Sequence, residues 1–99
     1  MNYTKNQTGT SCEVLIDGKF TFSDHSTFRE IISLMKTGIS SISLDLSKLE
    51  FVDSAALGMF LLAREEAGKN GVTVTLKNPQ GQVKKMFSVS KFESLFNII

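Results

Sequence analysis

Residues 44–58, with the sequence LDLSKLEFVDSAALG, join an alternating segment to a long apolar one. At the start of this stretch, residues 41–46 place an apolar side chain at every second position, a pattern that predicts a half-buried strand. Residues 54–69 are mostly apolar and are followed by Asn70-Gly71, a typical stop for a helix. We therefore expect a strand, a loop over residues 47–54 and a helix, in this order.

Upstream of this stretch, the sequence predicts another strand and another helix. Residues 11–17, SCEVLID, alternate apolar with polar side chains, and Asp17-Gly18 is typical of a tight turn after a strand. Residues 2–8 are polar and predict only a weak edge strand. From Phe28, apolar residues recur at i+3, i+4 and i+7, and Gly38 follows them, which predicts an amphipathic helix.

Downstream, a further strand and helix follow. Residues 72–77, VTVTLK, are β-branched and alternating, which predicts a strand. Asn78-Pro79 ends this strand and offers an N-cap and a first helical residue to a third helix. Residues 95–99, LFNII, predict a last strand. Because strands and helices alternate, we expect an α/β fold in one domain over residues 1–99: a mostly parallel (mixed) central sheet of four to five strands with helices packed on it.

Length and composition exclude several classes of protein. The 99 residues carry 11 Lys and Arg against 10 Asp and Glu, and a net charge of +1 provides no basic field for nucleic acid. Cys12 and His25 are the only residues of their types, so we expect neither a disulfide nor a metal site. The longest apolar run, residues 55–63, is less than half of the ~20 residues that a spanning helix needs. We expect no cofactor, no nucleic-acid binding, no direct membrane insertion and, because residues 1–10 lack a leader pattern, a cytoplasmic location.

The pair Asp53-Ser54 stands at the start of the predicted central helix. The simplest interpretation is a helix cap, since Asp and Ser are favoured N-cap residues. A functional interpretation is that the Ser54 hydroxyl accepts a phosphoryl group, because the free N–H groups and the positive dipole end of a helix N-terminus favour an anion. The spacing by itself does not decide between the two.

The same stretch resembles the signature of the STAS domain family, which groups anti-sigma-factor antagonists with cytoplasmic domains of sulfate transporters. It contains D-L-S-x-L-x-F-x-D-S from Asp45 to Ser54, followed by Leu57-Gly58, and the order of predicted elements over residues 11–99 is similar to the family's. The resemblance implies a STAS-like fold. A short chain without a membrane segment is more similar to the stand-alone antagonist branch than to a transporter domain.

For function, the resemblance implies a phosphorylation-controlled partner switch. The unphosphorylated protein would bind an anti-sigma factor or a related regulator, a serine kinase of the histidine-kinase-like ATPase fold would end this binding, and a PP2C-type phosphatase would restore it. Ser54 matches the family's phosphoacceptor, Asp53 the acidic residue beside it, and Asp45 an Asp at the end of the preceding strand. No catalytic residue is expected in this chain, because the catalysis belongs to its partners.

The chain departs from the family pattern directly after Ser54. Many members read D-S-[ST]-G-L-G where this chain reads D-S-A-A-L-G. Ala55 leaves Ser54 as the only hydroxyl at this place. Ala56, in the place of glycine, stiffens the start of the helix, where a kinase would approach.

A helical wheel of residues 54–69 separates two faces at about 100° per residue. The predicted buried face consists of Ala56, Leu57, Phe60, Leu61, Ala63 and Ala67. The predicted solvent face carries Glu65, Glu66 and Lys69, and with them Ala55, Gly58, Met59 and Leu62. The last four are either scattered exposed residues of an ordinary kind or a partner-binding strip beside Ser54.

Three other functions are weighed against this one, and only the last of them, a constitutive subunit, stays as an alternative. A Ser-His-Asp hydrolase would use Ser54, His25 and an aspartate, but the sequence has no G-x-S-x-G motif. A receiver-like domain would use Asp45 or Asp53 as its phosphoacceptor, but no acidic pair for magnesium follows the first strand. A constitutive subunit of the same fold, such as the small cytoplasmic component of a lipid-transport ABC complex, would form a lasting complex that ignores changes at Ser54.

Overall fold

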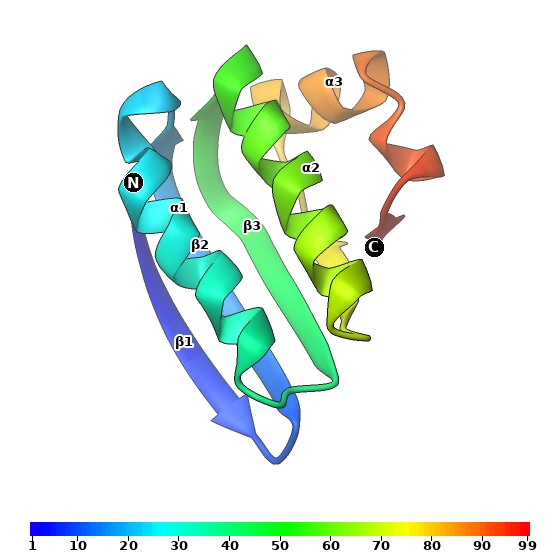
Figure 1. The fold of residues 1–99 in the computed structure, drawn as a ribbon. Helices are drawn as coiled ribbons and strands as arrows, with labels where there is room; N and C mark the ends of the chain where they lie inside the picture. Colours follow the sequence, from blue (N-terminus) through cyan, green and yellow to red (C-terminus); the bar gives the residue numbers. More distant parts are fainter.

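The computed structural model describes residues 1–99 and consists of a five-stranded sheet with helices packed on it (Figure 1). The strands are β1 (Asn2–Thr8), β2 (Ser11–Phe20), β3 (Ser41–Val52), β4 (Thr73–Lys77) and β5 (Asn97–Ile98). The α-helices are α1 (His25–Ser33), α2 (Ser54–Lys69) and α3 (Gly81–Val89). Short 3-10 helices are η1 (Phe22–Asp24), η2 (Leu34–Lys36) and η3 (Phe92–Ser94). None of the helices has the length and apolar character needed to cross a membrane.

The strands lie in the order β1-β2-β3-β4-β5 across the sheet. β1 is antiparallel to β2, whereas β2, β3, β4 and β5 run parallel to one another. Figure 1 shows α1 and α2 side by side over one face of the sheet. Phe87 of α3 contacts Phe60 of α2, so α3 joins the same layer. The predicted α/β class and mixed, mostly parallel sheet are therefore confirmed.

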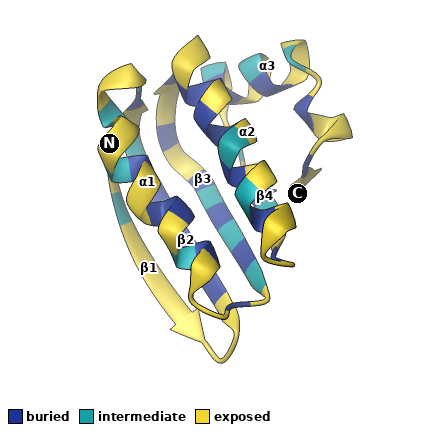
Figure 2. Ribbon diagram, viewed as in Figure 1, coloured by how far each residue is buried: buried dark blue, intermediate teal, exposed yellow.

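The two faces of the sheet differ in composition. The face beneath the helices carries fully buried residues such as Leu44 and Leu76, and the buried positions recur along the strands in Figure 2. On the opposite face, the Lys77 ammonium lies 2.9 Å from a carboxylate oxygen of Glu13. No helix covers this second face, and its Ser, Thr, Glu and Lys side chains keep it compatible with solvent.

A cluster of phenylalanine rings around Phe60 of α2 forms the centre of the core. The centroid of the Phe60 ring lies 5.4 Å from those of Phe20, Phe28 and Phe87, and 6.3 Å from that of Phe92. All of these contacts are edge-to-face, a geometry that adds stabilisation beyond the burial of apolar area. One residue of α2 thus connects β2, α1, α3 and η3.

β2 is longer than predicted, because Asp17-Gly18 forms no turn. The strand continues to Phe20, and its pairing with β3 shifts register between Leu15 and Asp17 and again between Gly18 and Lys19. Gly18 has φ = +84°, a conformation that glycine adopts without a steric penalty. The predicted turn is wrong: glycine here marks an irregularity inside a parallel strand.

β3 also runs further than predicted and takes up most of residues 47–54, which were expected to form a loop. Two consecutive exposed residues, starting with Ser47, interrupt the alternation on which the prediction rested. The Ser47 N–H donates to Oδ1 of Asp45 at 3.0 Å, so a local side-chain bond satisfies the irregular backbone. Beyond this point Leu49 is buried again, and the strand resumes its contact with the core.

The C-terminal elements begin later than predicted. Asn78 has φ = +55°, a left-handed conformation that asparagine tolerates and a helix start excludes, and α3 begins at Gly81 with Gln80 as its N-cap. The predicted Asn78 cap is therefore wrong. Of the expected strand over residues 95–99, only β5 forms.

Other predictions are confirmed. The weak edge strand exists as β1, and the first amphipathic helix exists as α1, which continues into η2 before Gly38. The bounds of α2 coincide with the predicted helix over residues 54–69. The order of elements therefore brings the start of α2 to the end of β3.

Candidate functional site

α1, α2 and α3 all begin at the edge of the sheet where β2 and β3 end (Figure 1). The Asp53 N–H donates to the Phe20 carbonyl at 3.3 Å, which joins the ends of the two strands. The Gln82 side chain, in the first turn of α3, accepts from the Val52 N–H at 3.0 Å and donates to the Val52 carbonyl at 2.8 Å. Helix N-termini, with their unpaired N–H groups, therefore lie at the same edge as Ser54.

Asp53 caps α2, as the simplest interpretation of the sequence requires. Its Oδ1 accepts from the Ala56 N–H at 2.8 Å, and its backbone is extended, as in an N-cap residue. Its Oδ2 accepts a second hydrogen bond, from the Phe22 N–H at 3.0 Å. Both carboxylate oxygens are thus engaged with backbone groups, and Asp53 positions its neighbours.

Ser54 is the first residue of α2, and its side chain is exposed. The backbone N–H groups of this first turn have no acceptor within the helix, and the positive end of the helix dipole lies here. An anionic group on the Ser54 oxygen would therefore meet hydrogen-bond donors and a favourable potential. This chemistry permits Ser54 to accept a phosphoryl group.

Asp45 does not lie beside Ser54, and its predicted place in the environment of that serine is wrong. It occupies the middle of β3, on the face opposite to buried Leu44, and at ~3.3 Å per residue it lies about 20 Å or more from the end of the strand. Burial raises the pKa of the Asp45 carboxyl, but the hydrogen bond from Ser47 and the charge of Lys77 outweigh it and leave the pKa lowered. Asp45 therefore belongs to the polar sheet face.

The solvent-facing side of α2 differs from the predicted one. Ala55 and Gly58 are exposed as expected, but Met59 is only 8% exposed and Leu62 is half-buried against the core. In the opposite direction, Leu61 was predicted to be buried and is 41% exposed. We call the exposed residues in the first half of α2, Ser54, Ala55, Gly58 and Leu61, the outward strip.

The neighbours of α2 explain this rotation. Glu66, which lies on the same side of the helix as Met59, pairs with Lys36 of η2 at 3.3 Å, so this side of α2 faces η2 and is covered. Arg64, on the other side, donates to the Leu95 carbonyl at 2.7 Å and faces the C-terminal segment. Leu61 points between these two contacts, into solvent.

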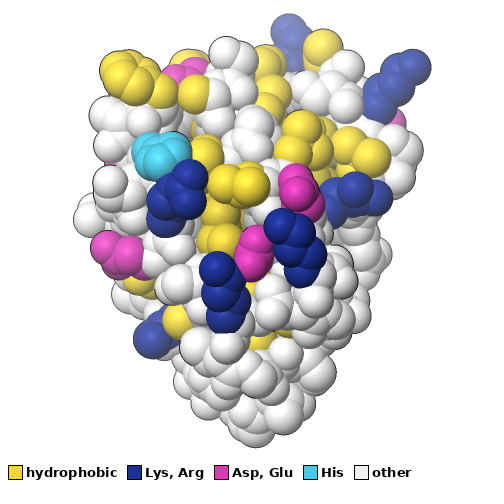
Figure 3. Space-filling model, in the orientation of Figure 1, with side chains coloured by type: hydrophobic (Ala, Val, Ile, Leu, Met, Phe, Trp, Pro, Cys, Tyr) yellow, Lys and Arg dark blue, Asp and Glu magenta, His cyan; other side chains and the backbone are white.

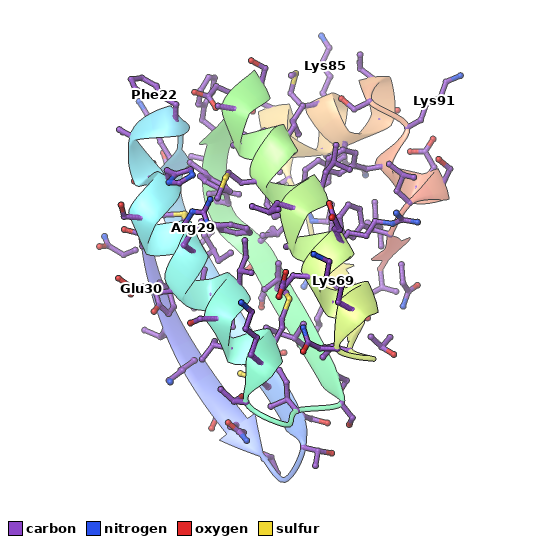
Figure 4. The ribbon with its side chains drawn as sticks, viewed as in Figure 1. Phe22, Arg29, Glu30, Lys69, Lys85 and Lys91 are labelled. Atoms are coloured by element: carbon purple, nitrogen blue, oxygen red, sulfur yellow. The ribbon has the colours of Figure 1, made fainter.

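Sequence reasoning missed Phe22 as a surface residue of this site. Its side chain is 74% exposed. Figure 4 shows Phe22 at the end of the molecule where α2 begins, and Lys85 of α3 lies at the same end. The bond from its N–H to Asp53 ties the η1 turn to the start of α2. No periodicity marks Phe22, because it lies in a turn whose position depends on that tertiary hydrogen bond.

The hydrolase alternative has no support in the geometry. His25 accepts a hydrogen bond through Nε2 from Nε of Arg29 at 3.2 Å, on the outer side of α1. In Figure 3 the histidine lies next to a basic side chain on the surface of the molecule. The Ser54 hydroxyl makes no hydrogen bond to this imidazole, and no three His, Cys, Asp or Glu side chains form a metal-ligand cluster.

Comparison with known proteins identifies the family. A sequence model of the family described as "Mlab, STAS domain" matches residues 3–97. A STAS-domain containing protein from Pseudomonas aeruginosa is 34% identical over 90 residues, which cover 91% of this chain and 89% of that protein.

Solved structures share the fold. A candidate anti-sigma factor antagonist from Thermotoga maritima superposes with a TM-score of 0.87 at 17% identity, covering 97% of this chain and 84% of that one. The anti-sigma factor antagonist SpoIIAA in its unphosphorylated form gives 0.82 at 17% identity, covering 99% and 88%. The phosphorylated form of Bacillus SpoIIAA gives 0.71 at 18% identity, covering 99% and 91%. Because the family match spans nearly the whole chain and agrees with both the motif and the fold, this protein belongs to the STAS domain family.

Proposed function

We propose that this protein is a phosphorylation-controlled partner-switching protein. In its unphosphorylated form it binds an anti-sigma factor or a related regulator, and phosphorylation of Ser54 by a serine kinase of the histidine-kinase-like ATPase fold ends the binding. A PP2C-type phosphatase removes the phosphoryl group. The chain itself is a ligand and a substrate in the cytoplasm and catalyses no step.

The observation that carries this proposal is the position of Ser54. Its exposed hydroxyl lies at the N-terminal end of the outward strip, which presents Ala55, Gly58 and Leu61 to solvent on one helix. The fold is also that of SpoIIAA, an anti-sigma factor antagonist whose structure is known in unphosphorylated and phosphorylated forms.

The outward strip gives the switch a physical cause. A phosphoryl group adds a charge of about −1.5 to −2 at the edge of an apolar contact, and burying this charge without a partner is unfavourable. To move the occupancy of a complex from 99:1 to 1:99, the modification must change the binding free energy by about 5.5 kcal/mol. A buried, unpaired phosphate provides a change of this order without refolding the domain.

The first experiment is mass spectrometry of the protein isolated from its native cell. We expect one phosphoryl adduct that maps to Ser54 and is absent from the Ser54→Ala variant. Ser54→Ala should retain its partner during co-purification, and Ser54→Asp should lose it, with at least a 100-fold weaker affinity. Ser88→Asp, at an exposed serine of α3, serves as the control for added charge and should bind normally.

A second candidate function is a constitutive subunit of the same fold, as in a lipid-transport ABC complex. The matching family model is described by the name Mlab and not as an antagonist, which favours this alternative. A constitutive subunit would show no adduct at Ser54, and its complex would tolerate Ser54→Asp. Equal affinity of wild type and Ser54→Asp for the captured partner would therefore refute the switch.

A further inference from the structure

The η1 turn presents Phe22 beside the start of α2. Within this turn, the Thr21 N–H donates to Oδ2 of Asp24 at 2.9 Å, which closes the turn locally. The Phe22 N–H has a different acceptor, Oδ2 of Asp53, which lies 31 residues away in the sequence. The tertiary position of the exposed Phe22 ring therefore depends on the carboxylate that also caps α2.

Each carboxylate oxygen of Asp53 accepts from a different backbone N–H. Oδ1 accepts from the Ala56 N–H at 2.8 Å, and Oδ2 accepts from the Phe22 N–H at 3.0 Å. The two bonds share one negative charge, and hydrogen bonds to a charged acceptor are stronger than neutral ones. A change in the position of this carboxylate therefore acts on the α2 start and on the η1 turn together.

A phosphoryl group on Ser54 would act directly on this carboxylate. It would place a second anion on the next residue of the chain, and like charges at such short range repel. The phosphoryl oxygens would also compete with Asp53 for the free N–H groups of the first helical turn. The helix start can exchange one anionic acceptor for the other, whereas the Phe22 N–H has only Asp53.

We propose that Asp53 is a positioning residue that couples Ser54 to the η1 turn, so that a phosphoryl group on Ser54 releases the Phe22 N–H and loosens the turn that presents the Phe22 ring. This inference rests on the proposed role of Ser54 as a phosphoacceptor. The coupling itself is a property of this chain and can be measured without a partner. It adds a second effect to the switch, because a partner that contacts Phe22 would sense the phosphoryl group at a distance from it.

The test is NMR on the full chain with phosphoserine installed at position 54. We expect the amide proton of Phe22 to move upfield, as it does when a bond to a carboxylate is lost, and its hydrogen exchange to accelerate about tenfold or more. Amides of β4 should keep their exchange rates. Phosphoserine at position 88, in α3, is the matched control and should leave Phe22 unchanged.

Asp53→Asn separates the two bonds of this residue. The amide oxygen of asparagine can still cap α2, but the amide nitrogen that replaces one carboxylate oxygen cannot accept from Phe22. We expect fast exchange at Phe22 with intact protection in α2, and no further change at Phe22 when phosphoserine is added at position 54. The proposal would be overturned if phosphoserine at position 54 left the chemical shift and hydrogen exchange of the Phe22 amide unchanged in the otherwise wild-type chain. It would also be overturned if phosphoserine changed them as much in Asp53→Asn as in wild type. If the cell never phosphorylates Ser54, the proposed function fails while this coupling remains measurable.

Discussion

Asp45 and Asp53 belong to the same motif, yet the fold gives them unrelated partners. Asp53 directly follows β3 and accepts from two backbone N–H groups, one in α2 and one in η1. Asp45 points to the uncovered sheet face, where it holds the Ser47 N–H and lies within the field of Lys77. At the scale of single residues, one carboxylate organises the candidate site and the other stabilises a strand irregularity.

The lowered pKa of Asp45 predicts a pH dependence of stability. The folded-state pKa lies below the unfolded value of about 3.9, so the ionised carboxylate stabilises the fold above about pH 4, and this contribution is lost as the pH falls through the folded-state pKa. We expect Asp45→Asn to lower the free energy of unfolding near neutral pH and to converge with wild type in acid. Urea unfolding at a series of pH values measures this difference.

Thr4→Ala is the control for the Asp45 experiment. Thr4 lies on the same face of the sheet and carries no charge. The free energy of unfolding of Thr4→Ala should therefore follow that of wild type in parallel at every pH. A gap between wild type and Asp45→Asn that widens as the pH falls would contradict the stated cause.

At the scale of elements, the junction of β3 with α3 depends on a side chain that imitates a strand. Gln82 accepts from the N–H and donates to the carbonyl of Val52, as a neighbouring strand would. This pair of bonds satisfies the end of β3 on the side where the sheet offers no partner. It also fixes the start of α3 next to the start of α2.

Removing the Gln82 side chain should weaken this junction. We expect Gln82→Ala to lower the free energy of unfolding by about 1 to 2 kcal/mol, because it leaves the partly buried N–H and carbonyl of Val52 unpaired. Gln80→Ala is the matched control. The Gln80 side chain bonds only to the nearby Asn78 carbonyl, so its removal should change stability by less than about 0.5 kcal/mol. Equal urea midpoints for the two variants would show that the junction contributes nothing.

At the scale of the whole molecule, the phenylalanine cluster joins elements that are far apart in the sequence. Phe60 contacts rings from β2, α1, α3 and η3, and all of these partners are buried. A domain of this size has a total stability of about 5 to 15 kcal/mol, so the loss of one central ring affects a large part of it. The exposed Phe22 has no comparable role in the core.

Two phenylalanine variants test this contrast. We expect Phe60→Ala to lower the free energy of unfolding by about 3 to 5 kcal/mol, since it opens a cavity at the centre of the core. Phe22→Ala should change it by less than about 0.5 kcal/mol, because the ring is exposed. Denaturant unfolding of both variants measures the difference, and a similar loss for both would contradict the assignment of Phe60 as the centre of the core.

Much of the fold could be predicted, because local patterns carry its main features. The alternation in residues 41–46 and the apolar run of α2 belong to segments whose side-chain period is visible in the sequence. Predictions based on turn residues did less well. Asp17-Gly18 and Asn78 are typical of turns and caps, but Gly18 lies inside β2 and Asn78 precedes α3 by several residues. These residues permit unusual backbone angles without deciding where the angles are used.

The sequence by itself determined the class of fold, the bounds of α2, and the place of Asp53-Ser54 at the start of this helix, because these features depend on neighbours along the chain. Only the tertiary structure decided that Leu61 and not Met59 faces solvent, that Asp45 is separated from Ser54, and that Phe22 is held beside the site. Each of these depends on contacts between segments distant in the sequence. A helical wheel shows which residues of α2 share a side. The contacts of α2 with η2 and with the C-terminal segment decide how the helix is rotated about its axis, and so which side faces solvent.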